Sequence, residues 1–541
     1  MKYSAIAYLN VRVPMRDGVE LSTQIYLPSG GGSFPVLFSR TPYDALSKGG
    51  ELEWPDRGFA CVRQDVRGKF RSGGEWYPWM NERNDGEDTL NWIAAQSWCN
   101  GNIAMYGGSY VAATQSAVAI TGHPALKCFT PCLIGGEFYH ANYRGGAFRL
   151  GWQTRWTLAP KLISDQDQIR GHLPLLEMDV YSGGKEIPFW RDVLSHPLKD
   201  SFWEASSVGT HLSSVQAPAF IRTGWFDHFV GDIFDLFNGL RKHGGNDEVR
   251  KFSRILIGPW AHSINVCALD DEDFGEVGKV ADLYEQEIEF IKYFVASESA
   301  YDTAVAPIRL FVMGANLWRD EYEWPLARTT WTEMFLSSGG QANTSGGDGC
   351  LGGAASGLED HFDYDPEKPV PLLGGAWDFS NVGPRDQTQI ELREDVLVYT
   401  SEELIEDREV TGPVTVKLYA SSSARDTDFT AKLVDVRSNG KPMSVTDGII
   451  RARYRDKGKP EELLRPGAVY EFTIECNPTS YLFKKGHKIR LEISSSNFPA
   501  FSRNLNTGND TATDVEMVVA HQAVFHSAEY PSRIILPVIQ N

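Results

Sequence analysis

The amino-acid sequence predicts an α/β domain built on a parallel sheet, followed by an all-β domain. Short apolar runs typical of buried strands alternate with helix-like segments in the first half of the chain, at 35–39, 60–65, 103–106, 217–223 and 253–257. Strands that alternate with helices indicate a parallel sheet. After about residue 326 the helix-like segments stop, and runs such as 414–420 and 488–493 alternate with the period of two that is typical of half-buried strands.

A segment rich in Trp, Tyr, Arg and Leu interrupts the strand-helix alternation between about residues 135 and 215. We therefore expect residues 1–134 and 216–325 to form one α/β-hydrolase domain, with 135–215 inserted as a helical cap. Residues 326–541 are predicted to form a β-sandwich of the jelly-roll type. The α/β part should open with a hairpin whose turn lies at Asp17 and Gly18, and should carry a helix over 84–95.

Composition excludes several classes of protein. The chain has 541 residues, 42% hydrophobic and 12% aromatic, which indicates a folded protein of more than one domain. Its 52 Lys and Arg against 71 Asp and Glu leave a net charge of −19, which opposes binding to nucleic acid or to an anionic membrane surface. Whether the protein forms a homo-oligomer is left open.

The seven cysteines are scattered and lack paired metal-ligand spacing, so no metal site and no cofactor are predicted. Cys128 and Cys132 have the spacing of one helix face and are expected to be buried free thiols. The first residues lack a signal-peptide pattern, and no apolar run of 18 residues occurs. These features predict a cytoplasmic protein.

The run Gly107-Gly108-Ser109-Tyr110 lies between an apolar strand-like segment and a helix-like segment of small residues, 111–120. Strand, sharp turn and helix in this order hold a serine at the carboxyl end of the strand with strained backbone angles. Val111 stands where the pattern Gly-x-Ser-x-Gly requires glycine. An ordinary Gly-Ser turn remains the alternative on this pattern alone.

Asp227 and His262 also follow short apolar runs directly, each after a turn that begins with glycine. In a doubly wound sheet the carboxyl ends of the strands form one crevice, so distant residues meet there. The order Ser, Asp, His is the order of an α/β-hydrolase triad. Asp232 and Asp235 remain alternative acids. Acyl transfer also needs donors to an oxyanion; one is the backbone N–H after the serine, and a tyrosine hydroxyl could be the other.

The sequence resembles the cocaine-esterase-like serine hydrolases, a family that includes α-amino-acid ester hydrolases and X-Pro dipeptidyl-peptidases. The resemblance implies an α/β-hydrolase domain with a helical cap, and a jelly roll that closes the active-site cleft. The matching segments are Pro14–Val19, Thr41–Asp44, Gln64–Gly68, Asp88–Ile93, Gly107–Tyr110, Gly224–Asp227, Gly258–His262, Asp428–Val436 and Ser494–Pro499.

The resemblance also implies roles for single residues. Ser109 would be the nucleophile, Asp227 the acid and His262 the base, with the Tyr43 hydroxyl and the Tyr110 backbone N–H as oxyanion donors. Ala112 and His228 stand where the family usually has glycine, and the cap is shorter. The candidates for substrate binding are Phe229, His228, Trp152, Trp156 and Trp377.

We therefore expect a serine carboxylesterase that forms an acyl-enzyme with small esters of an uncharged, aromatic or bulky acyl group. Phe229 after the acid and the tryptophans of the cap favour such a group. An α-amino-acid ester hydrolase or acyl-aminopeptidase-type hydrolase is the alternative, disfavoured by His228 and Phe229 in the stretch where those enzymes carry carboxylates, although Asp232 and Asp378 keep it open. An alternative of another class is a non-enzymatic, ligand-binding jelly-roll protein with a vestigial serine turn.

Overall fold

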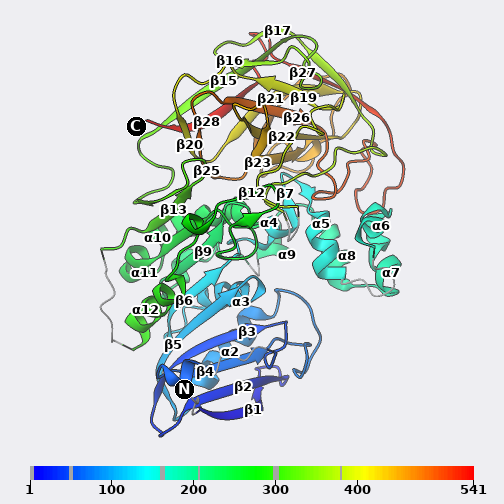
Figure 1. Cartoon of the computed structure of the whole chain (residues 1–541). Helices are drawn as coiled ribbons and strands as arrows, with labels where there is room; N and C mark the ends of the chain where they lie inside the picture. Colours follow the sequence, from blue (N-terminus) through cyan, green and yellow to red (C-terminus); the bar gives the residue numbers. More distant parts are fainter. Residues whose placement is uncertain are drawn as a thin grey trace.

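The computed structural model describes residues 5–47, 53–158, 165–204, 207–296, 304–377 and 381–540. An α/β domain and a β-rich domain stack end to end in Figure 1, and a small group of helices lies beside their junction. The chain begins in the α/β domain and ends in the β-rich domain. The predicted fold class, an α/β-hydrolase domain with a helical insertion and a C-terminal jelly roll, is confirmed.

The described residues of the α/β domain form a sheet of ten strands in the order β1-β2-β4-β3-β5-β6-β9-β10-β13-β14. Strands β4 to β13 of this order run parallel, and β1, β2 and β14 are antiparallel to their neighbours. The strands are β1 (Ala5–Pro14), β2 (Glu20–Pro28), β3 (Phe34–Thr41), β4 (Ala60–Asp65), β5 (Cys99–Gly108), β6 (Leu126–Cys132), β9 (Phe220–Gly224), β10 (Arg254–Gly258), β13 (Ile308–Val312) and β14 (Leu317–Glu321).

Helix α3 lies on β3, β5 and β6 and packs against α2, while α12 lies on β5 and β6. The helices of this domain are α1 (Glu53–Asp56), α2 (Glu82–Ala94), α3 (Tyr110–Ala119), α10 (Ile233–His243), α11 (Asp247–Phe252) and α12 (Leu283–Val295). Cys128 and Cys132, whose spacing would also fit one face of a helix, lie on the buried strand β6 and are buried free thiols, as expected. Short buried strands and buried helix segments share the same apolar composition, so periodicity could not separate them.

The inserted segment forms short helices and one small hairpin. They are α4 (Phe138–Asn142), β7 (Tyr143–Arg144), β8 (Ala147–Phe148), α5 (Leu150–Gln153), a π-helical turn (Thr154–Leu158), α6 (Gln166–Gly171), α7 (Met178–Gly183), α8 (Pro188–Ser195) and α9 (Ser201–Glu204). Their aromatic core is continuous with Trp79 and Tyr110 of the α/β domain. The hairpin docks on the jelly roll at Gly145, where a Cβ atom would lie 2.0 Å from the Ile449 carbonyl oxygen. The cap thus contacts both domains.

The β-rich domain is a jelly roll of mostly antiparallel strands. They are β15 (Thr329–Gly339), β16 (Cys350–Gly352), β17 (Ser356–Leu358), β18 (Asp360–Tyr364), β19 (Leu397–Thr400), β20 (Arg408–Gly412), β21 (Thr415–Ser422), β22 (Asp428–Val436), β23 (Pro442–Arg451), β24 (Tyr470–Glu475), β25 (Thr479–Phe483), β26 (Lys488–Ser494), β27 (Ala520–Phe525) and β28 (Arg533–Ile539). Burial alternates along most of β21, as predicted, whereas β26 is buried on both faces over its second half, where Glu492 and Ser494 are buried as well as Leu491 and Ile493. No helix in the described ranges is long and apolar enough to cross a membrane.

Candidate active site

Ser109 stands at the turn between β5 and α3 with φ of 59° and ψ of −128°. Such a left-handed conformation costs a non-glycine residue about 1–3 kcal/mol and persists only where its surroundings hold it. The Ser109 N–H donates to the Cys132 carbonyl oxygen at 2.8 Å. Gly107 has φ of 125°, and a Cβ atom there would lie 2.5 Å from Val111 Cγ1. Val111 therefore occupies space that only a glycine at 107 leaves free.

Two further side chains form a line of hydrogen bonds with this serine. Ser109 Oγ lies 3.0 Å from His262 Nε2, and His262 Nδ1 lies 2.6 Å from Asp227 Oδ2. Asp227 follows β9 and His262 follows β10, so all three stand beyond the carboxyl ends of parallel strands. A histidine between a serine and a carboxylate can take the serine proton at one ring nitrogen while the other donates to the carboxylate.

The carboxylate of Asp227 is fully buried, and both of its oxygens are engaged. Besides the bond to His262, the backbone N–H of Phe229 donates to Asp227 Oδ1 at 2.8 Å. The ring of Phe229 stands edge-on to the His262 ring at 5.7 Å between centroids. Asp227 is therefore fixed in one orientation, which in turn fixes the imidazole tautomer.

Asp232 and Asp235, the alternative acids, lie away from this line. Asp232 Oδ2 accepts from the backbone N–H groups of Gly136 and Glu137, both at 3.0 Å, so its carboxylate caps a loop. Asp235 lies on α10, where burial and then the neighbouring Asp232 raise the pKa of its carboxyl. Asp378 lies outside the described residues.

Tyr43 and Tyr110, the two expected oxyanion donors, both adjoin Ser109. The Trp156 indole N–H donates to the Tyr43 hydroxyl at 3.2 Å. The Tyr43 ring is 45% exposed, but its hydroxyl end is enclosed; burial raises its pKa, and hydrogen bonds with Trp156 and Ser109 partly offset this. The phenol therefore keeps its proton for donation. Tyr110 is the first residue of α3, so its N–H is not used by the hydrogen bonds within the helix.

A row of aromatic rings from the cap covers the site. Trp156, in the π-helical turn, stacks on Tyr110 at 5.6 Å and on Trp152 at 5.3 Å. Trp152 reaches His228 at 5.0 Å, and His228 reaches His262 at 4.4 Å. Burial, and then the charges of His262 and Arg149, lower the pKa of His228 well below its ordinary value. The row is therefore apolar or neutral along its length.

Trp377 comes from the C-terminal domain and lies beside the cap. It packs on α5 of the cap, where a Cβ atom on Gly151 would lie 2.0 Å from its ring, and it lines a small cavity together with Trp152 and Arg149. The structure thus brings Phe229, His228, Trp152 and Trp156 next to the serine turn or to one another, and places Trp377 behind Trp152.

Asp227, His228 and His262 offer ligand atoms within 4.8 Å of one another, which is also the spacing of a metal site. Both ring nitrogens of His262 are already engaged, with Asp227 and with Ser109. A metal ion held by His262 would displace one of these partners. The cluster is better suited to proton transfer than to metal binding.

The sequence pattern did not point to three residues that adjoin the site. Trp79 stacks on Tyr110 at 4.2 Å, and Glu82 accepts a hydrogen bond from the Tyr110 hydroxyl at 2.8 Å. Arg40 is fully buried at the end of β3 and donates to Glu82. The sequence signal that could have identified Arg40 is a charged residue directly after the strand-like run 35–39. A charge buried there requires partners of opposite charge.

Comparisons with known proteins agree with this architecture. The family model of the X-Pro dipeptidyl-peptidases (S15 family) matches residues 17–264, and the model of the X-Pro dipeptidyl-peptidase C-terminal non-catalytic domain matches residues 303–535. The cocaine esterase of Rhodococcus sp. (strain MB1 Bresler) is 38% identical over 572 residues, covering 98% of each chain.

Two solved structures resemble the whole chain. One is an aminopeptidase from a marine sediment archaeon (Thaumarchaeota), with a TM-score of 0.85, 26% identity and coverage of 99% of this chain and 97% of the other. The second is an α-amino acid ester hydrolase, with a TM-score of 0.83, 26% identity and coverage of 99% and 96%. The chain belongs to the S15 family and, within it, to the cocaine-esterase-like hydrolases. It is an enzyme, a serine hydrolase, which rules out a non-enzymatic jelly-roll protein.

Proposed function

We propose that the protein is a carboxylesterase that hydrolyses esters of an uncharged acyl group through an acyl-enzyme on Ser109. The observation that carries this proposal is the line from Ser109 Oγ to His262 Nε2, 3.0 Å, and from His262 Nδ1 to Asp227 Oδ2, 2.6 Å. It stands at a strand-turn-helix whose serine has positive φ. The identity of 38% to a cocaine esterase over almost the whole chain supports an ester as the substrate.

The steps follow from these contacts. His262 Nε2 takes the Ser109 proton as Oγ attacks the ester carbonyl, and Asp227 stabilises the imidazolium. The negative charge that forms on the carbonyl oxygen accepts from the Tyr43 O–H and the Tyr110 N–H. Collapse breaks the bond to the alcohol oxygen, which takes the proton from His262. Water then attacks the acyl-enzyme while His262 takes its proton. The proton passes to Ser109 Oγ as the bond between Oγ and the acyl carbon breaks, which releases the acid and restores Ser109.

The preference for an uncharged acyl group rests on the side chains of the aromatic row. Trp152 and Phe229 are each 4% exposed, and both rings contact the neutral His228, which lies against His262. Arg149 is a buried cation of the cap that acts on His228, and burial and Arg144 lower its own pKa to about 10. A cation beside the site repels a substrate ammonium group, whereas flat rings favour an aryl or bulky alkyl group.

A second candidate is hydrolysis of α-amino-acyl esters or amides. Its support is the similarity over the whole chain to an aminopeptidase and to an α-amino acid ester hydrolase. Such a substrate needs carboxylates for its ammonium group. Asp232, the described carboxylate that follows the acid most closely in sequence, is engaged with the loop at Gly136 and Glu137. The second candidate therefore ranks below the first.

Covalent labelling tests the nucleophile. An active-site organophosphonate should add one mass increment per chain, and peptide mapping should place it on Ser109. Ser109→Ala should take up no label. Ser116→Ala is the matched control, because Ser116 is a buried serine on the same helix α3 but lies away from the turn. An adduct on another serine, or esterase activity retained in Ser109→Ala, would contradict the proposal.

A matched pair of substrates tests the acyl group. Phenylacetyl and phenylglycyl esters of one phenol differ at the α-carbon by an ammonium group and share the ring. We expect kcat/KM to be at least about 10-fold higher for the phenylacetyl ester, since one charged group left unpaired typically lowers transition-state binding by that much or more. A higher value for the phenylglycyl ester would select the second candidate.

A further inference from the structure

The side chain of Tyr110 is fixed far more firmly than an ordinary core tyrosine. Its hydroxyl donates to Glu82 Oε1 at 2.8 Å and accepts from the Trp79 backbone N–H at 2.9 Å. Its ring is stacked on Trp79 on one side and lies near parallel to Trp156, and the residue is only 1% exposed. Because Tyr110 is the first residue of α3, a shift of its ring would shift the backbone N–H that follows Ser109.

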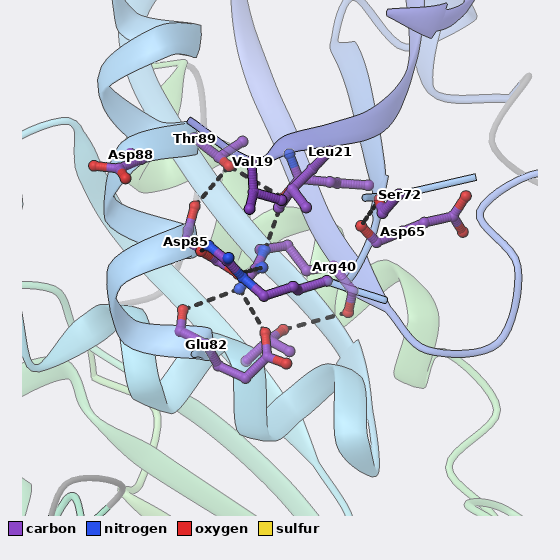
Figure 2. Close-up of polar contacts among 12 residues, drawn as sticks. Val19, Leu21, Arg40, Asp65, Ser72, Glu82, Asp85, Asp88 and Thr89 are labelled. Atoms are coloured by element: carbon purple, nitrogen blue, oxygen red, sulfur yellow. Dashed lines mark hydrogen bonds and ion pairs between the residues drawn. The ribbon is translucent and has the colours of Figure 1, made fainter. Parts of the chain in front are cut away.

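The carboxylate that holds this tyrosine is itself held by a buried cation. Glu82 Oε2 accepts from Arg40 at 2.6 Å, and Arg40 also donates to the Glu82 backbone carbonyl at 2.9 Å. Figure 2 shows the Arg40 side chain between Glu82 and Asp85 of helix α2. Arg40 Nε donates to Gln64 Oε1 at 2.8 Å, so the guanidinium is fixed at three points.

The network continues from Arg40 to a second carboxylate and a second arginine. Asp85 lies 3.6 Å from Arg40 and takes two hydrogen bonds from Arg67, at 2.6 and 3.0 Å. Arg67 also pairs with the exposed Asp17 at 2.7 Å, so two arginines and three carboxylates form one network that runs from the buried Glu82 to the surface. Burial raises the pKa of Glu82, while Arg40 and the Tyr110 hydroxyl lower it in part. Removal of one partner from such a network would leave an uncompensated buried charge. Movements that separate the partners are therefore costly, and the side chains of the network hold their positions.

Arg40 also belongs to the segment that carries the other oxyanion donor. It is the penultimate residue of strand β3, next to Thr41 and three residues before Tyr43, and the Thr114 hydroxyl of α3 donates to the Arg40 carbonyl at 3.3 Å. The Tyr43 N–H donates to the Thr41 hydroxyl at 3.0 Å, which ties the loop to the end of the strand. The Glu82 carboxylate thus links helix α3, which begins with Tyr110, to the end of strand β3, which leads into Tyr43.

From this arrangement we propose that Glu82 is a positioning residue for the oxyanion hole, acting through the Tyr110 hydroxyl and through Arg40. It keeps the Tyr110 N–H and the Tyr43 hydroxyl at a fixed mutual distance during acyl transfer. It touches neither the substrate nor Ser109. This inference rests on the proposed function, because it assigns a role within the same site.

Tyr110→Phe tests the first link, since it keeps the ring and the backbone N–H and removes the hydroxyl with its two hydrogen bonds, to Glu82 and from the Trp79 N–H. We expect kcat to fall by about 10- to 100-fold with KM changed by less than about twofold, because loss of alignment acts in the transition state. Affinity for an aryl boronic acid, which mimics the tetrahedral intermediate, should fall by a similar factor. The pH dependence of kcat should keep its midpoint, because the line from Ser109 to Asp227 is untouched.

Tyr399→Phe is the matched control. Tyr399 is a fully buried tyrosine that donates to a buried carboxylate, Asp360, at 2.7 Å, but it lies in the jelly roll on β19. The Tyr399→Phe variant should have a lower Tm than the wild type and an unchanged kcat per active site. Active sites are counted by titration with the organophosphonate, so that unfolded enzyme does not enter kcat.

Glu82→Gln and the double variant test the second link. Glutamine has one acceptor oxygen, whereas Glu82 offers one oxygen to Tyr110 and the other to Arg40, so each single variant breaks the same hydrogen-bonded unit. The double variant should therefore lose no more than about twofold beyond the worse single one. Wild-type kcat and boronate affinity in Tyr110→Phe, or multiplicative losses in the double variant, would overturn the inference. Should Glu82→Gln fail to fold, Tyr110→Phe decides alone. Failure of the proposed function is distinguishable, because Ser109 would then take up no label in the wild-type enzyme.

Discussion

A second group of a serine, a histidine and an aspartate lies in the jelly roll, and it differs from the triad in its connections. Ser338 donates to Asp360 Oδ2 at 2.7 Å, and His526 Nε2 lies 2.9 Å from the same oxygen. His526 Nδ1 donates to the carbonyl oxygen of Ser356 at 2.9 Å. Ser338 Oγ also lies 3.1 Å from His526 Nε2, but that nitrogen is shared with Asp360. Tyr399 donates to Asp360 as well at 2.7 Å, so the carboxylate, not the histidine, is at the centre.

The difference shows that the order of the hydrogen bonds, not the residue types, makes a nucleophile. In the α/β domain the histidine stands between serine and carboxylate, so one ring nitrogen can accept the serine proton. Ser338 instead lies within strand β15 and already donates its proton to Asp360. The jelly-roll group is therefore suited to fastening strands β15, β18, β19 and β27 together.

The largest contrast is expected between the two serines. Ser109→Ala should lower kcat on the order of 10⁶-fold, the loss typical for a triad nucleophile. Ser338→Ala should leave kcat per active site unchanged and lower only the thermal stability. Hydrolysis of a chromogenic ester together with thermal unfolding measures both quantities. An equal loss of activity in the two variants would erase the distinction.

The two histidines should separate in the same way. His262→Ala removes the proposed base and should lower kcat by a factor on the order of 10³ or more. His526→Ala breaks the bonds to Asp360 and Ser356, so Tm should fall while kcat per titrated site stays the same. Activity loss in His526→Ala beyond the loss of folded enzyme would mean that the jelly roll takes part in turnover.

The tyrosines give a smaller but more specific contrast. Tyr43→Phe keeps the ring and removes one oxyanion donor, which typically costs a factor of about 10²–10³ in kcat with little change in KM. Tyr399→Phe removes a hydroxyl of the jelly-roll group and should change stability only. Near-wild-type kcat in Tyr43→Phe would remove this phenol from the mechanism, and a large rise in KM would reassign it to substrate binding.

The smallest expected effect is a dependence of stability on pH. Burial alone would raise the pKa of Asp360, but hydrogen bonds from His526, the Ala342 N–H, Tyr399 and Ser338 outweigh it and lower the pKa. Because the pKa of Asp360 is lower in the folded than in the unfolded protein, its ionised carboxylate stabilises the fold. This stabilisation is complete at pH values above the unfolded pKa of about 3.9, and it is lost as the pH falls through the folded pKa.

Asp360→Asn removes this charge. At pH 6 we expect the variant to be less stable by about 1–3 kcal/mol, the usual cost of breaking buried hydrogen bonds to one group. The difference in stability between wild type and variant should shrink as pH falls below about 4. Denaturant unfolding at several pH values measures it, and a difference that stays constant or grows on acidification would contradict the assigned charge.

Much of the fold could be predicted because it depends on local order along the chain. The apolar runs at 35–39, 60–65, 217–223 and 253–257 predicted β3, β4, β9 and β10. The strand β6 was missed, since its Lys127 and Pro131 interrupt the apolar run and its two cysteines have helical spacing. Its place between β5 and β9 follows from pairing across the sheet, which no local pattern contains.

The sequence by itself determined the serine turn and the order of Ser109, Asp227 and His262, because strand ends and glycines are readable from neighbouring residues. Only the tertiary structure decided which partners these residues have. The row from Tyr110 through Trp156 to His228, and the hold of Glu82 on Tyr110, join segments that are dozens to more than a hundred residues apart. The jelly-roll group that resembles the triad joins Ser338 to His526 over 188 residues. Such contacts depend on how helices, cap and sandwich pack, and packing is a property of the whole chain.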